Sequence, residues 1–197
     1  MSSNTIDPIS WQQILGIVVG SGIISTILHQ VIEWLKERRA RAEELNKERR
    51  YLYLCIAVEL ERYSIECARQ IEGNQLADDS DGHAGTLNCD LPELGMYPTN
   101  VDWRESDIKL TSRALSFPNE IRLGKYNVDT ILEFIDDNKI DHINETLGTY
   151  GYRALILAYD LRAAAGIQSI FSQEKGWDPS NRLKEFDEKA KRRKQCG

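Results

Sequence analysis

Residues 11–35 read WQQILGIVVGSGIISTILHQVIEWL, and Glu33 is their only charged side chain. A run of about 20 mostly apolar residues is long enough to cross a bilayer as a helix. Trp11 and Trp34 stand near its ends, where membrane helices are enriched in tryptophan. The stretch predicts a transmembrane helix over 11–35 after a short tail over 1–10. A surface amphipathic helix and a soluble core helix are the alternatives. A signal peptide is disfavoured, because the tail lacks Lys and Arg.

A basic stretch follows the apolar one and decides its expected orientation. Residues 36–50 contain seven Lys or Arg and four Glu, whereas the N-terminal flank contributes only Asp7. Membrane helices keep their positive flank inside, so we expect the cell (inner) membrane, an outside N-terminus and a cytoplasmic domain after Leu35. The stretch lacks Pro and Gly and should continue the helix as a stalk. The cations expected at the membrane surface are Lys36, Arg38, Arg39, Arg41, Lys191, Arg192, Arg193 and Lys194.

Two faces of the predicted transmembrane helix carry distinct features. Gly16 and Gly20 form a G-x-x-x-G pair, which lets two helix backbones approach closely, so we expect homo-oligomerisation through this face. Ser25, His29 and Glu33 lie on a polar face, and the last two are one helical turn apart. Such groups inside a bilayer can line a pore. Near the inner interface, however, snorkelling or a helix–helix hydrogen bond is the simpler interpretation.

The charge and cysteine patterns of the rest of the chain exclude some functions. The formal net charge is −6, although the stalk and the C-terminal tail are basic, so the body between them is acidic. An acidic body offers no basic face to a phosphate backbone, and nucleic acid is not expected as a partner. The four cysteines show no C-x-x-C spacing, which is typical of free thiols in a reducing compartment.

Helical periodicity begins in the stalk and continues into the acidic body. Apolar residues recur there at spacings of three, four or seven, which predicts an amphipathic helix. We expect Gly73 and Asn74 to end this helix. The stripe consists of Leu45, Leu52, Ile56, Leu60, Tyr63, Cys67 and Ile71.

Later segments repeat this pattern, and no segment alternates like a strand. Helices are predicted over about 104–116, from Pro118 to about 135, over 140–165, and in a basic C-terminal segment, 177–197. A ridge of small residues should allow close helix packing; it consists of Gly148, Gly151, Ala154 and Ala158. The predicted fold class is all-α: a single N-terminal transmembrane helix, continuing as a stalk into an antiparallel helical bundle over 51–176.

Residues 74–103 form the one long irregular segment of the predicted bundle. Its first half is acidic, and an EF-hand alignment of residues 78–83 leaves both end positions without a carboxylate. Its second half, 91–103, carries apolar residues such as Met96 that should pack across the bundle. The loop is therefore expected to be partly solvated and partly packed, without a calcium site.

Motifs for catalysis are missing from the sequence. It contains no G-x-S-x-G, no P-loop and no G-x-G-x-x-G, and no paired spacing of His or Cys that would begin a metal site. We therefore assign no catalytic residue, no metal and no cofactor. An enzyme would need a site assembled from scattered residues around the loop, such as His83, Asp90, Glu93 and Asp102.

The sequence favours a non-enzymatic, membrane-anchored interaction module acting as a scaffold, sensor or adaptor in the cytoplasm. Its expected partners are the lipid bilayer, further copies of itself and an unidentified cytoplasmic protein. Two alternatives remain open: an oligomeric membrane effector whose transmembrane helices form or gate a pore, and an enzyme with a site around residues 78–103.

Overall fold

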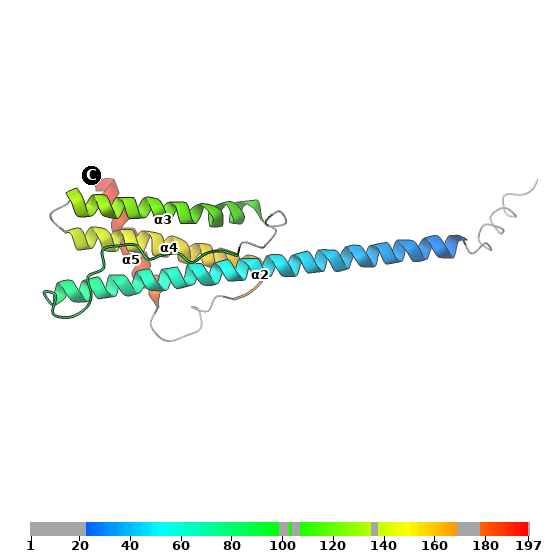
Figure 1. Cartoon of the computed structure of the whole chain (residues 1–197), viewed down its shortest axis with the longest axis horizontal. Helices are drawn as coiled ribbons and strands as arrows, with labels where there is room; N and C mark the ends of the chain where they lie inside the picture. Colours follow the sequence, from blue (N-terminus) through cyan, green and yellow to red (C-terminus); the bar gives the residue numbers. More distant parts are fainter. Residues whose placement is uncertain (1–22, 99–102, 104–106, 135–137, 169–177, 197) are drawn as a thin grey trace, which may run out of the picture. The chain divides into compact units, whose positions relative to one another are not determined.

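The computed structural model describes residues 23–98, 103, 107–134, 138–168 and 178–196 (Figure 1). Over these residues the protein is all-α, as predicted, with four helices and no strand. The chain divides into two compact units, Met1–Asn46 and Lys47–Gly197. The helices are α2 (Ile23–Asp79), α3 (Ile108–Phe134), α4 (Lys139–Ala165) and α5 (Pro179–Cys196).

The predicted transmembrane segment is covered only in its C-terminal part. Residues 11–22, which include Gly16 and Gly20, and the tail 1–10 lie outside the described residues. Across the ranges that the structure describes, no helix has the length and apolar character needed to span a bilayer. The described start of α2 exposes its large apolar side chains by 43–56%: Leu28, Val31, Ile32, Trp34 and Leu35.

Within the second unit, α2 buries the predicted apolar stripe. Six of its seven members are at most 2% exposed: Leu52, Ile56, Leu60, Tyr63, Cys67 and Ile71. Leu45 was expected to belong with them but is 41% exposed, because it lies in the first unit, before the core residues begin. The periodicity therefore identified the buried face correctly, and only its starting point was wrong.

The prediction that Gly73 and Asn74 end this helix is wrong, because α2 continues to Asp79. The Asn74 side chain is buried and holds the following loop: it accepts a hydrogen bond from the Asn88 N–H at 2.7 Å and donates to the Asn88 carbonyl at 3.0 Å. A Cβ on Gly73 would stand 3.2 Å from the Thr86 carbonyl oxygen. Both residues thus serve the loop that packs against the helix, and neither caps it.

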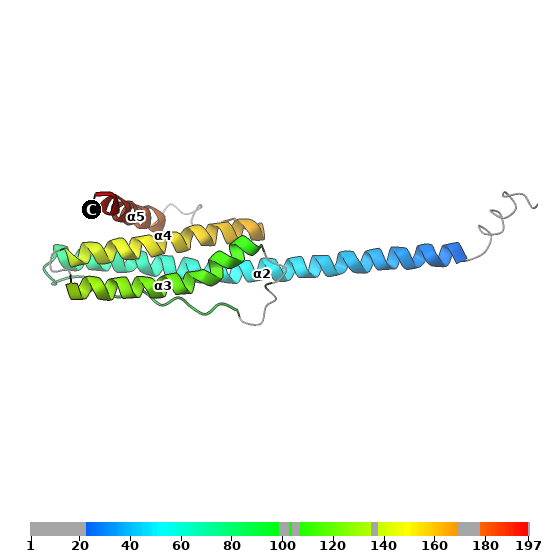
Figure 2. The ribbon, with the colours of Figure 1, turned by 90° about the horizontal axis from the view of Figure 1, so that it is seen from above.

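One helix, α3, replaces the two that were predicted on either side of Pro118. It begins at Ile108, where the Asp107 carboxylate accepts hydrogen bonds from the N–H groups of Lys109 and Leu110 at 2.9 and 3.0 Å. Pro118 lies inside the helix. Proline lacks the N–H for the helical hydrogen bond and bends a helix, and Figure 2 shows α3 changing direction along its length. Phe117 and Ile121, on either side of it, remain in the core.

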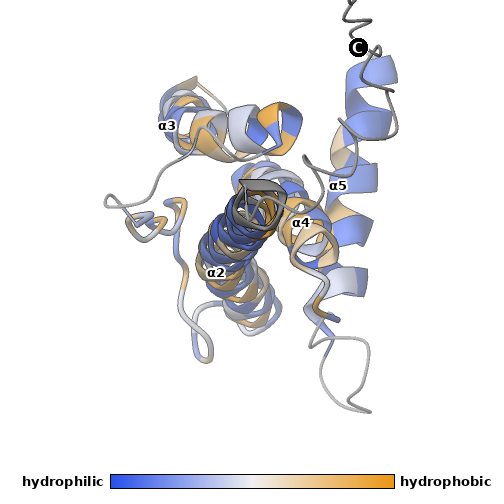
Figure 3. Cartoon of the chain, turned by 90° about the vertical axis from the view of Figure 1, so that its right-hand side faces the viewer, coloured by the Kyte–Doolittle hydropathy of each residue, from blue (hydrophilic) through white to orange (hydrophobic). Residues whose placement is uncertain are grey.

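Helix α4 is the centre of the second unit and contacts the other three helices (Figure 3). Its ridge of small residues packs as predicted. A Cβ on Gly151 would stand 2.6 Å from Leu183 Cδ2 on α5 and 2.8 Å from Cys67 Cβ on α2. A Cβ on Gly148 would overlap the Phe186 side chain of α5. The Ser64 hydroxyl of α2 also donates to the Gly151 carbonyl at 3.0 Å.

The helix directions correct the expectation of a simple antiparallel bundle. α4 runs opposite to α3 and to the second-unit part of α2, whereas α2 and α3 run the same way (Figure 1). The segment from Ser80 to Pro98 carries the chain back along the bundle. Leu91 is buried there, and Leu94 and Tyr97 are half-buried against the core, as predicted. Met96, which was predicted to pack as well, is 94% exposed.

Candidate functional site

The polar face predicted for the first helix is described only in part. His29 Nε2 lies 3.1 Å from Glu33 Oε1, and both side chains are exposed, which confirms that these two residues meet across one helical turn. Ser25 belongs to α2, but its side chain lies outside the described part of the chain, as does the Gly16–Gly20 pair. The structure therefore brings together two members of this face.

The predicted membrane-surface cations fall into two groups. Those of the first unit are exposed on α2: Lys36, Arg38, Arg39 and Arg41. Those of the C-terminal tail lie on α5, where Lys191 Nζ is 2.5 Å from Asp187 Oδ2 and Arg193 pairs with Glu145. Arg192 and Lys194 are exposed. Two of the four tail cations thus form ion pairs within the second unit.

The residues named for an enzyme do not gather into a site. His83, Asp90 and Glu93 are all exposed, and Asp90 Oδ2 lies 3.8 Å from Lys125 Nζ. Asp102 lies outside the described residues. Where the structure describes the chain, no three His, Cys, Asp or Glu side chains converge on a common point that could hold a metal ion.

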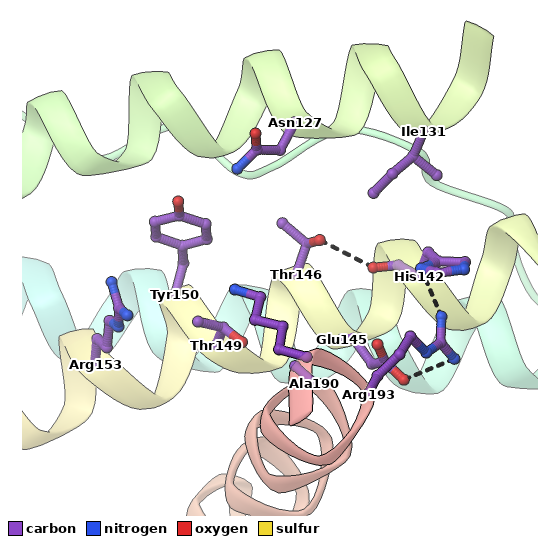
Figure 4. A pocket seen from close by; sticks show the side chains of 11 residues that line it. Asn127, Ile131, His142, Glu145, Thr146, Thr149, Tyr150, Arg153, Ala190 and Arg193 are labelled. Atoms are coloured by element: carbon purple, nitrogen blue, oxygen red, sulfur yellow. Dashed lines mark hydrogen bonds and ion pairs between the residues drawn. The ribbon is translucent and has the colours of Figure 1, made fainter. Parts of the chain in front are cut away.

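A cleft with a largely polar lining lies between α3, α4 and α5 in the second unit. Its volume is about 440 Å³, and each of the three helices lines it with residues at helical spacing (Figure 4). The lining residues are Asn127 and Ile131 of α3; His142, Glu145, Thr146, Thr149, Tyr150 and Arg153 of α4; and Ala190, Arg193 and Lys194 of α5.

Arg193 organises one end of this cleft. Its Nη2 lies 2.9 Å from Glu145 Oε1, and its Nη1 lies 2.5 Å from His142 Nδ1 (Figure 4). A guanidinium can only donate, so His142 Nδ1 accepts, and the proton of the neutral imidazole is then on Nε2. Burial raises the pKa of Glu145, and the positive charge of Arg193 opposes that rise. The Glu145 carboxylate therefore already has a cationic partner from α5, Arg193.

The other end of the cleft contains Arg153, a cation whose ion pair is longer than that of Arg193. Arg153 Nη1 lies 3.4 Å from Glu120 Oε2, and its guanidinium stands 5.9 Å from the centre of the Tyr150 ring. Burial raises the pKa of Tyr150, and Arg153 opposes this shift. Figure 4 shows the Tyr150 side chain pointing from α4 toward α3. The cleft therefore combines an aromatic wall with a partly exposed guanidinium.

Sequence reasoning missed this cleft. His142 did not stand out in the sequence, but it is half-buried and hydrogen-bonded to Arg193. A signal was present, because polar side chains recur along α4 at spacings of three and four between residues 142 and 153. The stripe alone does not say which helices face it. That depends on contacts with α3 and α5, which are distant in sequence.

Comparisons of the chain with protein families, with curated proteins and with solved structures give no match. Function therefore has to be inferred from the geometry and chemistry of the described residues. The features that bear on it are the exposed apolar start of α2, the exposed side of α3 and the polar cleft beside α4.

Proposed function

We propose that this protein is a membrane-attached, self-associating helical interaction module. The observation that carries the proposal is an uncovered apolar face at the start of α2. Leu28, Val31, Ile32 and Leu35 fall within about 100° of arc on the helix, and each is 43–56% exposed. A continuous exposed apolar face beside a basic stretch is typical of a helix that contacts lipid.

The sequence before this face supports insertion into the bilayer over attachment at its surface. No charged side chain occurs between Asp7 and Glu33, so the apolar face continues a stretch long enough to cross the hydrocarbon layer. Arg38 lies over the Trp34 ring at 4.4 Å, an arrangement suited to the membrane interface. The proposed arrangement has the N-terminus outside and the second unit in the cytoplasm.

An extraction experiment tests membrane attachment. The full chain is expressed in bacteria, and isolated membranes are washed with alkaline carbonate, which removes peripheral proteins. The protein should stay in the pellet and enter the soluble fraction only with detergent. Val18→Arg with Ile24→Arg should release it, whereas Arg39→Gln should not. Release of the unaltered chain by carbonate alone would contradict an inserted helix.

A second uncovered face supports self-association. On α3, Leu115, Leu123, Tyr126 and Phe134 are 49–73% exposed. The opposite side of the same helix buries Phe117, Ile121 and Val128 in the core. Single exposed leucines are ordinary, but several along one helix face mark a contact surface.

We assign this α3 face to contact with a second copy of the chain. One helix face covers less area than a stable independent interface of about 1,200 Å² or more. Membrane attachment and a contact through Gly16 and Gly20 would raise the local concentration of a second copy, so that a small contact becomes sufficient. A freely diffusing partner would lack this advantage.

A further inference from the structure

The cleft between α3, α4 and α5 is positively charged although the unit around it is acidic. Three cations line it, Arg153, Arg193 and Lys194, against one carboxylate, Glu145. Glu145 is already paired with Arg193, and His142 is neutral when it accepts from the same guanidinium. Lys194 therefore leaves the cleft with a positive charge that its lining does not neutralise, and Arg153 is offset only by Glu120, which lies outside the lining at 3.4 Å.

Donor groups also outnumber acceptors in the cleft. Lys194 is exposed and has no ion-pair partner among the residues that the structure describes. Arg153 is held only at 3.4 Å by Glu120, which leaves most of its N–H groups available. Thr149 lies one helical turn before Arg153 on the same face of α4 and adds a hydroxyl. The group that satisfies this set is a compact anion with several acceptor oxygens.

We propose that the cleft binds a phosphate-bearing ligand, with Arg153, Lys194 and Thr149 as its phosphoryl contacts. A phosphoryl group presents acceptor oxygens only, and arginine binds it through two parallel N–H groups. The volume of about 440 Å³ falls in the range of small-molecule sites. The remainder of the ligand would lie beside the Tyr150 ring and reach toward His142.

Arg193 is not among the proposed phosphoryl contacts, because its guanidinium is already bound at its own end of the cleft. Its guanidinium is held by Glu145 and His142, at 2.9 and 2.5 Å. His142 and Arg153 are eleven residues apart on α4, a rise of about 16 Å, so one phosphoryl group cannot reach both ends. Arg193 instead keeps α5 against α4 and positions Lys194, the next residue, at the cleft.

The inference goes beyond the proposed function and does not depend on membrane attachment. The same chemistry occurs in free phosphate esters and in phosphorylated lipid headgroups. Pyrophosphate is a suitable first probe, because it offers the phosphoryl oxygens without any further group. Its binding to the detergent-solubilised full chain is measured by calorimetry, so a failed extraction experiment leaves this measurement interpretable.

Matched variants separate the cleft from general surface charge. Arg153→Gln with Lys194→Gln should weaken pyrophosphate binding about tenfold or more, as expected when charge-assisted hydrogen bonds are lost. Arg182→Gln with Lys184→Gln removes the same charges from the start of α5, outside the cleft lining, and should change the affinity less than twofold. Equal weakening by both double variants, or no measurable binding of pyrophosphate by the unaltered chain, would overturn the proposal.

A variant with unchanged net charge controls for misfolding and for long-range electrostatic attraction of the anion. Thr149→Val keeps the side-chain shape and net charge but removes the hydroxyl, and it should weaken binding several-fold with unchanged helical content. If Thr149→Val binds like the unaltered chain while the charge variants do not, the phosphoryl group is not in this cleft.

Reconstituted protein distinguishes the two sources of phosphate. In phosphatidylcholine vesicles, pyrophosphate should bind as it does in detergent. Adding a phosphorylated phosphoinositide to the vesicles should reduce apparent pyrophosphate affinity if lipid headgroups occupy the cleft. An unchanged affinity assigns the cleft to a free phosphate ester. In either outcome the Arg153→Gln with Lys194→Gln protein must remain the weaker binder.

Discussion

At the scale of single residues, a buried ion pair joins α2 to α4 in the second unit. Arg162 Nε lies 2.5 Å from Glu61 Oε1, and Arg162 Nη2 lies 2.7 Å from Glu61 Oε2. The two side chains are only 5% and 6% exposed. The hydrogen bonds to Glu61 raise the pKa of Arg162, and burial opposes that rise. Both charged side chains can stay buried because the Arg162 guanidinium donates two hydrogen bonds to the Glu61 carboxylate and balances its charge.

Removing one partner should be much worse than removing both. Glu61→Gln or Arg162→Met alone leaves an unpaired buried charge and should lower the free energy of unfolding by about 3–5 kcal/mol. Glu61→Leu with Arg162→Met should cost far less than the sum of two such losses, because no buried charge remains. Urea unfolding followed by helical circular dichroism measures all of these variants. Simply additive losses would show that the pair is not coupled.

Residue-scale contacts of this kind were beyond prediction from sequence, and the reason is distance along the chain. Periodicity identified Leu60 and Tyr63 as core residues, because each shares a helix face with other apolar residues. It could not show that Glu61, between them, meets a residue 101 positions away. Asn74 is a similar case, since its amide donates to Asn144 Oδ1, 70 positions away, at 2.9 Å.

At the scale of elements, the close approach of α2, α4 and α5 depends on Gly151. Gly151→Ala should lower the free energy of unfolding by about 1–3 kcal/mol, because its Cβ would press on Leu183 and Cys67. This range is a net loss: the steric cost of the added Cβ exceeds the gain of about 1 kcal/mol that alanine brings over glycine at an ordinary helix position. Ser116→Ala, at an exposed position of α3, is the control and should change stability by less than about 0.5 kcal/mol. A stabilised Gly151→Ala protein in thermal unfolding would disprove the close packing.

The elements differ in how well their sequence signals predicted them. The bounds of α4 and the start of α5 were close to those found, because apolar spacing and local breakers such as Gly166 and Pro179 agree there. α3 was divided in two because Pro118 reads locally as a helix start. The buried Phe117 and Ile121 on either side of it keep the helix continuous, and that depends on tertiary packing.

The cleft beside α4 likewise could not be predicted from local sequence signals, because it depends on tertiary packing. Its residues on α4 and α5 recur at helical spacing, so each stripe is visible in the sequence. Their convergence arises from the packing of Gly148 against Phe186, which sets how closely α5 approaches. A motif search finds nothing here, because no two of the proposed phosphoryl contacts form a known local pattern.

At the scale of the whole molecule, self-association is proposed to rest on two contacts that support each other. In this proposal the Gly16–Gly20 pair would join two copies in the membrane, and the exposed α3 face would join them in the second unit. Because either contact holds the copies near each other, it raises the effective concentration for the other contact. Each contact alone should be weak, and the two together should give a stable oligomer.

The oligomeric state of the detergent-solubilised full chain, measured by light scattering and by equilibrium sedimentation, tests this arrangement. Gly16→Ile with Gly20→Ile should make the protein monomeric, because the bulky side chains keep the helix backbones apart. Leu123→Glu should weaken association about tenfold, the effect of losing a hydrophobic anchor worth roughly 1.4 kcal/mol. Leu76→Glu places the same charge at an exposed leucine of α2 and should leave association unchanged. If the glycine double variant keeps its oligomeric state, the membrane contact is wrong; if Leu123→Glu behaves like Leu76→Glu, the α3 contact is wrong.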